Sequence, residues 1–205
     1  MLSIVDEPFV PGTGDLLDTV ARRWDALRRE NPHYYDGRLY HVFGVHRNGH
    51  GGAVIHVADC AYRLHAVQDE DFDLGVRPLG VKGVVERDGR FLLGRRASCV
   101  GSYRNLWEFA PAGVVEPGRT PEETVGRELR EEVGLTPHGT PRAIAVLYDD
   151  VLRCWEVVLR IEPAETSDAV PPSTAEYESI TWCRLDALPE GMTPIAERMA
   201  VLLGG

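Results

Sequence analysis

Residues 113–135 read GVVEPGRTPEETVGRELREEVGL, and this stretch says most about the fold of the chain. Thr120 and Glu123 have the spacing of a capping box, in which each side chain binds the other residue's backbone amide. Gly134 follows the last turn, at the position where glycine commonly ends a helix. The sequence therefore predicts a helix over residues 120–133 with both of its ends specified.

Three acidic residues share one face of this predicted helix. With about 100° between successive residues, the side chains of Glu128, Glu131 and Glu132 fall within an arc of about 100°. A solvated face would tolerate them, because two carboxylates ~5.5 Å apart repel by less than about 1 kcal/mol in water. Clustered carboxylates at a loop-to-helix junction also suit Mg²⁺ or Mn²⁺, which leave coordination positions open for substrate phosphates. Both interpretations fit the pattern.

The same stretch resembles the Nudix box, G-x5-E-x7-R-E-U-x-E-E-x-G-U, in which U is a bulky aliphatic residue. The residues that match at the required spacing are Gly113, Arg127, Glu128, Leu129, Glu131, Glu132, Gly134 and Leu135. Arg119 stands where the box has its first glutamate, so the charge at that position is reversed. Residues 78–190 resemble the whole Nudix module.

The resemblance implies an α/β fold, specifically an α/β/α sandwich around a mixed sheet. It also implies Mg²⁺-dependent hydrolysis of a pyrophosphate bond in a nucleoside diphosphate derivative, with Mn²⁺ as the other candidate metal. The residues that would bind the metal are Glu128, Glu131 and Glu132. The residues that would serve catalysis are Glu132, Glu131 and Arg127, which would orient the glutamates. The general base would come either from the helix or from a later loop, where Glu176 and Glu178 are the candidates.

Arg119 keeps a second class of function open. The glutamate that it replaces normally supports the metal-site network, although Glu116, three residues earlier, is a candidate substitute. The alternative is therefore a catalytically weak Nudix-fold protein that binds a nucleotide or has a regulatory role. An isomerase on the same scaffold is a third and weaker option, because none of the four cysteines lies in a recognisable catalytic context.

Substrate-binding candidates surround a loop that leads into residues 106–113. Arg96 and Arg104 could meet a phosphate or a ribose, and Trp107 could stack on a base, although surface charge and core packing are the ordinary roles of such residues. Residues 31–37, NPHYYDG, are similar to the N-terminal part of Nudix proteins that hydrolyse UDP-sugars. This similarity covers few residues, and it slightly favours a nucleotide-sugar-like substrate.

Alternating strand and helix patterns flank the box and predict two domains. We expect an N-terminal extension of a helix and a β-hairpin over residues 1–77 and a Nudix hydrolase domain over residues 78–205. A loop over residues 162–178 is rich in Pro, Ser, Thr, Ala and Glu, and a loop of this length is usually functional or mobile. The expected strands cover 38–45, 53–58, 80–86, 91–94, 142–148, 152–161 and 179–184, and the further helices cover 13–30 and 194–203.

The charge balance restricts the partners of the protein. The 205-residue chain has 22 Lys and Arg against 32 Asp and Glu, which gives a formal net charge of −10. Such a chain repels nucleic acids and acidic membranes, so no binding to either is expected. The expected partner is a small-molecule nucleotide that approaches a local metal site. The sequence leaves the oligomeric state, including a homodimer, open.

The remaining features indicate a cytoplasmic protein. The N-terminus lacks a basic segment followed by an apolar run, and the longest apolar stretches are far shorter than the roughly 20 residues that cross a bilayer. Four cysteines occur without any C-x-x-C pair, at positions 60, 99, 154 and 183. We expect buried or partly buried free thiols in a reducing compartment.

Overall fold

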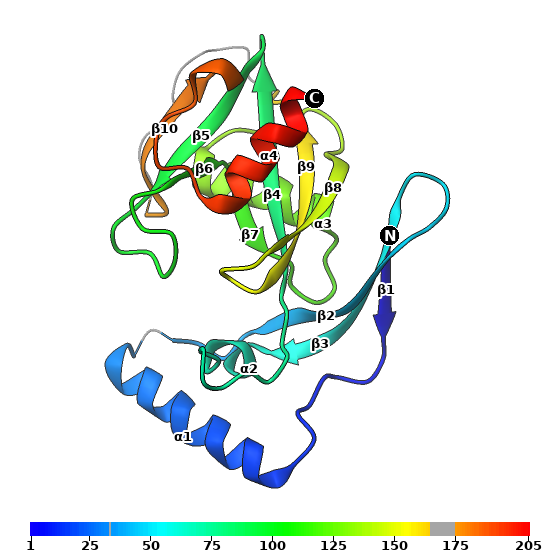
Figure 1. The fold of residues 1–205 in the computed structure, drawn as a ribbon, viewed down its shortest axis with the longest axis vertical. Coiled ribbons are helices and arrows are strands. Elements are labelled where there is room, and N and C mark those ends of the chain that lie inside the picture. Colours follow the sequence, from blue (N-terminus) through cyan, green and yellow to red (C-terminus); the bar gives the residue numbers. More distant parts are fainter. Residues whose placement is uncertain (33, 165–174) are drawn as a thin grey trace. The chain divides into compact units, whose positions relative to one another are not determined.

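The computed structural model describes residues 1–32, 34–164 and 175–205 (Figure 1). The chain folds into two compact units, one formed by Met1–Leu79 with Val115–Gly118 and the other by Gly80–Val114 with Arg119–Gly205. The separation into domains over residues 1–77 and 78–205 stays a prediction. Most of the long loop expected over residues 162–178 lies outside the described residues.

The N-terminal unit is built on a three-stranded sheet with the order β1-β3-β2. Strands β2 (Arg38–Arg47) and β3 (Ala53–Ala61) pair antiparallel and confirm the predicted hairpin. Strand β1 (Leu2–Val5), which was not predicted, pairs parallel with β3. Helix α1 (Gly14–Glu30) confirms the predicted helix, and the short helix α2 (Tyr62–Ala66) follows β3. The core of this unit contains Val20, Trp24, Leu39, Cys60, Leu64, Val67 and Val76.

A short segment of the box completes the N-terminal unit. The amide of Val115 donates to the carbonyl of Leu79 at 2.9 Å, and the Val115 carbonyl accepts from the Tyr40 amide at 3.4 Å. The Gly118 amide donates to the Tyr40 hydroxyl at 3.0 Å. Gly118 has a φ of +86°, a conformation that glycine adopts without strain. Residues 115–118 are therefore tied to β2 and to the first residue of β4.

The second unit contains a seven-stranded sheet with the path β10-β5-β4-β9-β8, in which β6 also pairs with β5 and β7 with β4 (Figure 1). The strands expected over 80–86 and 91–94 form an antiparallel hairpin of β4 and β5, and the strands expected over 142–148 and 152–161 pair antiparallel as β8 and β9. The strands are β4 (Leu79–Arg87), β5 (Arg90–Arg96), β6 (Trp107–Phe109), β7 (Ala112–Val114), β8 (Arg142–Asp149), β9 (Cys154–Ile161) and β10 (Tyr177–Cys183).

The helix of the box begins as predicted and ends differently. Thr120 and Glu123 form the capping box, with the Glu123 amide 3.2 Å from Thr120 Oγ1 and the Thr120 amide 2.9 Å from Glu123 Oε2. Helix α3 (Pro121–Glu128) then continues as a π-helical segment, η1 (Leu129–Val133), instead of the regular α-helix expected. π-helical turns are rare and occur often at functional sites. Gly134, with a φ of +72°, ends the segment.

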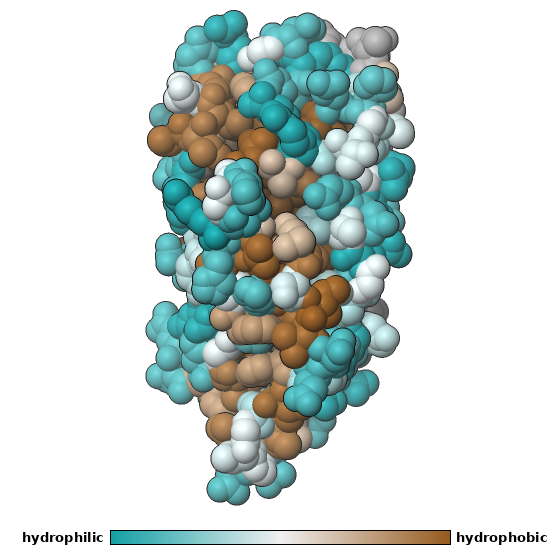
Figure 2. Space-filling view, turned by 90° about the vertical axis from the view of Figure 1, so that its right-hand side faces the viewer, coloured by the Kyte–Doolittle hydropathy of each residue, from teal (hydrophilic) through white to brown (hydrophobic). Residues whose placement is uncertain are grey.

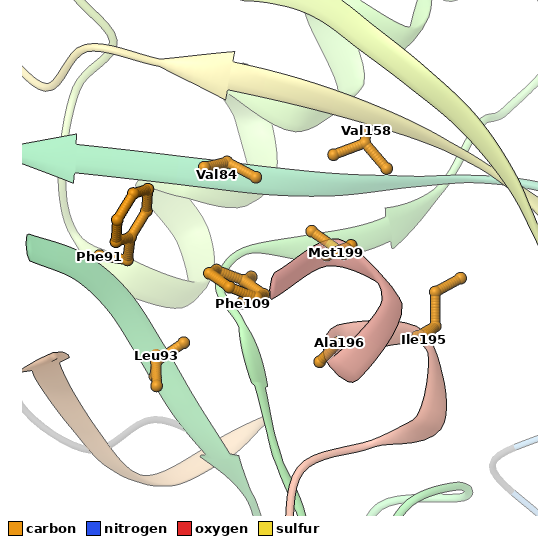
Figure 3. Close-up of a cluster of buried hydrophobic side chains, with 8 residues drawn as sticks. All are labelled: Val84, Phe91, Leu93, Phe109, Val158, Ile195, Ala196 and Met199. Carbon is orange, nitrogen blue, oxygen red and sulfur yellow. The ribbon is translucent and has the colours of Figure 1, made fainter. Parts of the chain in front are cut away.

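The two long helices of this unit cover opposite faces of its sheet. Helix α4 (Pro194–Gly204) packs through Ile195 and Met199 on a cluster that contains Val84 (Figure 3). A side chain at Gly113 would meet Glu128 of α3, and Gly113 pairs with Val81 of β4. Because side chains alternate along a strand, Val81 and Val84 face opposite sides. The predicted α/β/α sandwich is confirmed. A short 3₁₀ turn, η2 (Leu185–Ala187), lies between β10 and α4.

Apolar side chains also reach the surface on the face drawn in Figure 2. Exposed large hydrophobic residues of the chain include Ile4, Phe43 and Val201, which is ordinary for a folded protein. None of the helices in the described ranges is long and apolar enough to cross a bilayer. All four cysteines are free, but Cys99 is exposed, contrary to the expectation of burial, because it lies in the loop between β5 and β6.

Candidate active site

The glutamates of α3 and η1 lie beside strand β7. A Cβ atom at Gly113 would lie 2.7 Å from both Cγ and Oε1 of Glu128, so the Glu128 side chain occupies the space that a larger residue would need. The side chain of Glu128 is 12% exposed. Glycine at this position of the box therefore has a steric cause: it lets the first helical glutamate pack directly on the strand.

Glu132 is bound to the same strand through its carboxylate. Its Oε2 accepts a hydrogen bond from the Ala112 amide at 3.2 Å. Burial is the main cause that raises the pKa of Glu132 to about 8, the Ala112 amide opposes this shift, and the nearby charges of Glu128, Glu176 and Glu108 add to it. A cation at this position would favour the charged form of the acid.

Arg127 pairs with two of the three glutamates. Its Nη2 lies 2.6 Å from Glu128 Oε1, and its Nη1 lies 3.5 Å from Glu131 Oε2. Glu131 is the most accessible of the three, with a side chain that is 58% exposed. Glu123 also lies one turn from Arg127 along the helix, but its carboxylate is used in the capping box. The contacts of Arg127 agree with an orienting role, which stays a prediction.

The donor set suits a divalent cation by its chemistry. Glu128, Glu131 and Glu132 offer only carboxylate oxygens, the ligands that Mg²⁺ and Mn²⁺ favour. Glu132 is partly buried among other acids, and a divalent cation would neutralise this local excess of negative charge. Across the described residues, no three His, Cys, Asp or Glu side chains already converge as a ligand set. Glu128 and Glu131 are instead ion-paired with Arg127.

The two candidate general bases lie in different surroundings. Glu176 Oε1 is 2.7 Å from Nη1 of Arg96, and the charge of Glu176 contributes to the raised pKa of Glu132. Glu178 Oε1 is 2.8 Å from Nη1 of Arg95. The register between β10 and β5 shifts between Tyr177 and Ser179, which inserts Glu178 as an extra residue. Contacts also link Glu176 to the strand that binds Glu132: Arg96 contacts Glu108, Glu108 contacts Lys82, and Lys82 pairs with Ala112.

Each of the three substrate-binding candidates is already engaged in contacts within the protein. Arg96 is only 11% exposed and is held in ion pairs. Arg104 is exposed, and its Nε donates to the Val100 carbonyl at 2.7 Å. Trp107 packs against the hydrophobic cluster under α4. Substrate contact by these residues stays a prediction.

Sequence reasoning missed a buried polar network on the sheet. Lys82 Nζ lies 2.6 Å from Glu108 Oε2, and both side chains are almost fully buried. Glu108 Oε1 accepts from the Tyr177 hydroxyl at 3.3 Å. The signal was present, because Lys82 interrupts the apolar run LGVKGVV and Glu108 lies between Trp107 and Phe109. Charges within such runs are rarely buried without a partner.

The fold and the glutamate helix together define a Nudix-type sandwich with a candidate metal-binding face. The family model described as NUDIX domain matches residues 76–203, which is more than half of the chain. The chain therefore belongs to the NUDIX domain family.

Curated relatives of the chain have several activities. It is 29% identical over 102 residues to the isopentenyl-diphosphate Delta-isomerase of Corynebacterium diphtheriae, a match that covers 46% of this chain and 56% of that protein. It is 44% identical over 55 residues to the CTP pyrophosphohydrolase of Escherichia coli, covering 27% and 39%. A MutT-like protein of Streptomyces ambofaciens is 32% identical over 118 residues, covering 57% and 70%. The first two matches span only part of each relative.

Solved structures agree with the fold. The MutT NUDIX hydrolase of Burkholderia pseudomallei is 25% identical and superposes with a TM-score of 0.50 over 62% of this chain and 96% of its own. The MutT protein of Methanosarcina mazei Go1 is 21% identical, with a TM-score of 0.52 over 62% and 91%. Both likenesses cover about three fifths of the chain, and the second shows the fold alone.

Proposed function

We propose that the protein hydrolyses a pyrophosphate bond in a nucleoside diphosphate derivative, with Mg²⁺ held by Glu128, Glu131 and Glu132. The observation that carries the proposal is the attachment of two of these acids to β7, Glu128 against Gly113 and Glu132 on the Ala112 amide. A bound Mg²⁺ would neutralise diphosphate charge and lower the pKa of a water molecule. The E. coli relative named CTP pyrophosphohydrolase supports this class of reaction.

The chain's own residues have distinct tasks in this proposal. Arg127 holds Glu128 and Glu131 through its two terminal nitrogens, while the Ala112 amide fixes Glu132. Glu176, whose side chain is 34% exposed, takes a proton from water. The substrate is a small nucleotide derivative, with nucleotide sugars slightly preferred on the similarity of residues 31–37. A cytoplasmic location stays part of the proposal.

A substrate panel tests the proposal. Mg²⁺-dependent cleavage is measured on UDP-sugars, ADP-ribose, dinucleoside polyphosphates, coenzyme A and nucleoside triphosphates. We expect at least one substrate to be cleaved and Glu132→Gln to lose ~100-fold or more of the rate. Glu122→Gln, on the same helix but outside the glutamate face, is the matched control and should keep its rate. Equal rates for wild type and Glu132→Gln, or no cleavage at all, would disprove the catalytic proposal.

Arg119 is the observation that favours the second candidate, a nucleotide-binding protein with weak catalysis. Arg119 is exposed and directly precedes the capping residue Thr120. If the site has degenerated, Arg119→Glu should raise the rate strongly on the best substrate of the panel. An unchanged, already high rate removes this candidate. Isopentenyl diphosphate is added to the panel because of the isomerase relative, and its isomerisation would replace hydrolysis as the proposed activity.

A further inference from the structure

Arg96 joins two carboxylates of the candidate active site. Its Nη1 lies 3.1 Å from Glu108 Oε1 and 2.7 Å from Glu176 Oε1. Its Nε donates to the Ser102 carbonyl at 3.3 Å. Because the Arg96 side chain is only 11% exposed and already makes these contacts, the protein itself holds the guanidinium. This arrangement differs from that of a free arginine at a phosphate site.

Glu108 fixes Arg96 to the core of the sheet. Its other oxygen, Oε2, lies 2.6 Å from Lys82 Nζ, and Glu108 is 1% exposed. The Tyr177 hydroxyl also donates to Glu108 at 3.3 Å, while the Tyr177 ring occupies the space over Gly94 where a Cβ would collide with it. Rotation of Glu108 would take the carboxylate away from the buried ammonium group of Lys82, so the network favours one geometry.

Glu176 is the accessible end of this network. Its side chain is 34% exposed, whereas Arg96, Glu108 and Lys82 are nearly covered. The Glu176 carbonyl accepts from the Ala97 amide at 2.9 Å, which also fixes the backbone next to Arg96. In contrast, Arg95 and Glu178 form a pair with side chains that are 42% and 36% exposed. Of the two candidate bases, Glu176 is therefore the one bound to a cation that also pairs with a buried carboxylate.

We propose that Arg96 is a positioning residue that holds the Glu176 carboxylate on the Glu108–Lys82 network, which reaches strand β7 where Glu132 is bound. The inference rests on the proposed hydrolysis, in which Glu176 is the base in place of Glu178. Glu176 accepts one proton from water while the water oxygen bonds to phosphorus. The bridging P–O bond breaks, and its electron pair stays on the departing phosphate.

Kinetics of four variants test this role. Glu176→Gln should lower kcat by ~100-fold or more, the range of general-base catalysis. Arg96→Met should lower kcat about tenfold or more and change KM less than about threefold. In the Glu176→Gln background, Arg96→Met should add less than about threefold, because Arg96 acts through Glu176. Arg96→Lys should recover part of kcat, since it keeps the charge but loses the planar fork.

Several results would overturn the inference. A raised KM with unchanged kcat in Arg96→Met would make Arg96 a substrate ligand. If the loss of kcat in the double variant equals the product of the two single losses, Arg96 and Glu176 act independently. A loss of kcat in Glu178→Gln together with a normal Glu176→Gln would move the base to Glu178. Arg184→Met, which removes one member of the exposed Arg184–Asp186 pair, is the control and should keep wild-type kinetics.

A stability measurement tests the Arg96–Glu176 interaction even if the protein hydrolyses no substrate of the panel or a variant is too unstable to assay. A double-mutant cycle on urea unfolding compares Arg96→Lys with Glu176→Gln, beside Arg184→Lys with Asp186→Asn. We expect the first pair to be coupled at least fivefold in the unfolding equilibrium constant and the exposed pair less than about twofold. Equal coupling in the two cycles would overturn the positioning role, whether or not the panel contains a substrate.

Discussion

At the scale of single residues, the site depends on two neighbouring backbone positions. Gly113 makes room for the Glu128 side chain, and the Ala112 amide binds Glu132. Both residues lie on β7, which also pairs with β4 at Val81 and Lys82. Strand β7 therefore fixes the positions of Glu128 and Glu132, which belong to α3 and η1.

Replacing Gly113 with alanine should disturb Glu128 directly. The new Cβ would lie 2.7 Å from Cγ and Oε1 of Glu128, which is shorter than the non-bonded contacts that Cβ atoms make, so the glutamate side chain must move. We expect a destabilisation of about 1–3 kcal/mol and a loss of metal-dependent activity. Urea unfolding and the hydrolysis assay measure both effects. Gly101→Ala, where a Cβ meets nothing within 4 Å, is the control.

The raised pKa of Glu132 should make metal binding depend on pH. With a pKa of about 8, the carboxyl is mostly protonated near neutral pH and must release its proton to a cation. We expect apparent Mg²⁺ affinity to increase by up to about tenfold per pH unit below pH 8 and to level off above it. Titration calorimetry in buffers of different ionisation enthalpy detects the released proton. An affinity that does not change with pH would contradict this account, as would a Glu132→Gln variant with the wild-type slope.

At the scale of secondary-structure elements, sequence patterns performed well where local chemistry decides the outcome. The capping box of Thr120 and Glu123 predicted the start of α3, and the strands expected over 80–86 and 91–94 are present as β4 and β5. The π-helical turn of η1 was missed, because its sequence is equally compatible with a regular helix. Strand β1 was missed because its four residues form a strand by pairing with β3, a contact that is distant in the sequence.

The capping box should contribute measurably to helix α3. Thr120→Ala removes the acceptor of the Glu123 amide, whose hydrogen bond is 3.2 Å long. We expect a loss of about 0.5–2 kcal/mol in the free energy of unfolding. Chemical denaturation compares this variant with Thr140→Ala, a substitution in an exposed loop. If the two variants are equally stable, the cap does not stabilise the helix.

At the scale of the whole molecule, buried charge was the part that sequence reasoning could not place. The motif identified Glu128, Glu131 and Glu132, but it gave no reason to connect Lys82, Glu108 and Arg96. Those residues come from three strands, and only the register of the folded sheet brings them together. The same limit explains why Arg96 was expected to contact substrate.

Buried Glu156 should influence how stability varies with pH. Its Oε2 is without a hydrogen-bond partner among the described residues, and burial raises its pKa to about 7, against the opposing charge of Lys82. The folded pKa exceeds the ordinary value of 4.5, so the folded state binds more protons between these values. The stabilisation from neutral Glu156 is complete below pH 4.5 and is lost as the pH rises through 7.

Glu156→Gln should remove this dependence. As the pH rises from about 5 to 8, the free energy of unfolding of the wild type should fall by about 2–3 kcal/mol more than that of the variant. Urea unfolding at several pH values measures the difference, with the exposed Glu197→Gln as control. Identical slopes in all three proteins would show that Glu156 keeps its charge on folding.

The hydroxyl of Tyr40 should stabilise the unit to which residues 115–118 belong. Tyr40 is 3% exposed, and its hydroxyl accepts from the Gly118 amide. Tyr40→Phe leaves that amide without this partner, and we expect a loss of about 1–3 kcal/mol. Tyr35→Phe, at a residue that is 81% exposed, is the control. Amide hydrogen exchange should accelerate at Gly118 in the first variant only.

The segment Val115–Gly118 also bears on how this protein could have been assembled during evolution. Val115 and Gly118, inside the family's motif, take hydrogen-bond partners from Tyr40 and Leu79, so this short part of the motif belongs to the N-terminal unit. A gene fusion that exchanged residues 1–77 for an unrelated sequence would have to replace the Tyr40 contact. Without such a replacement, the Gly118 amide would lose the hydroxyl that it now binds.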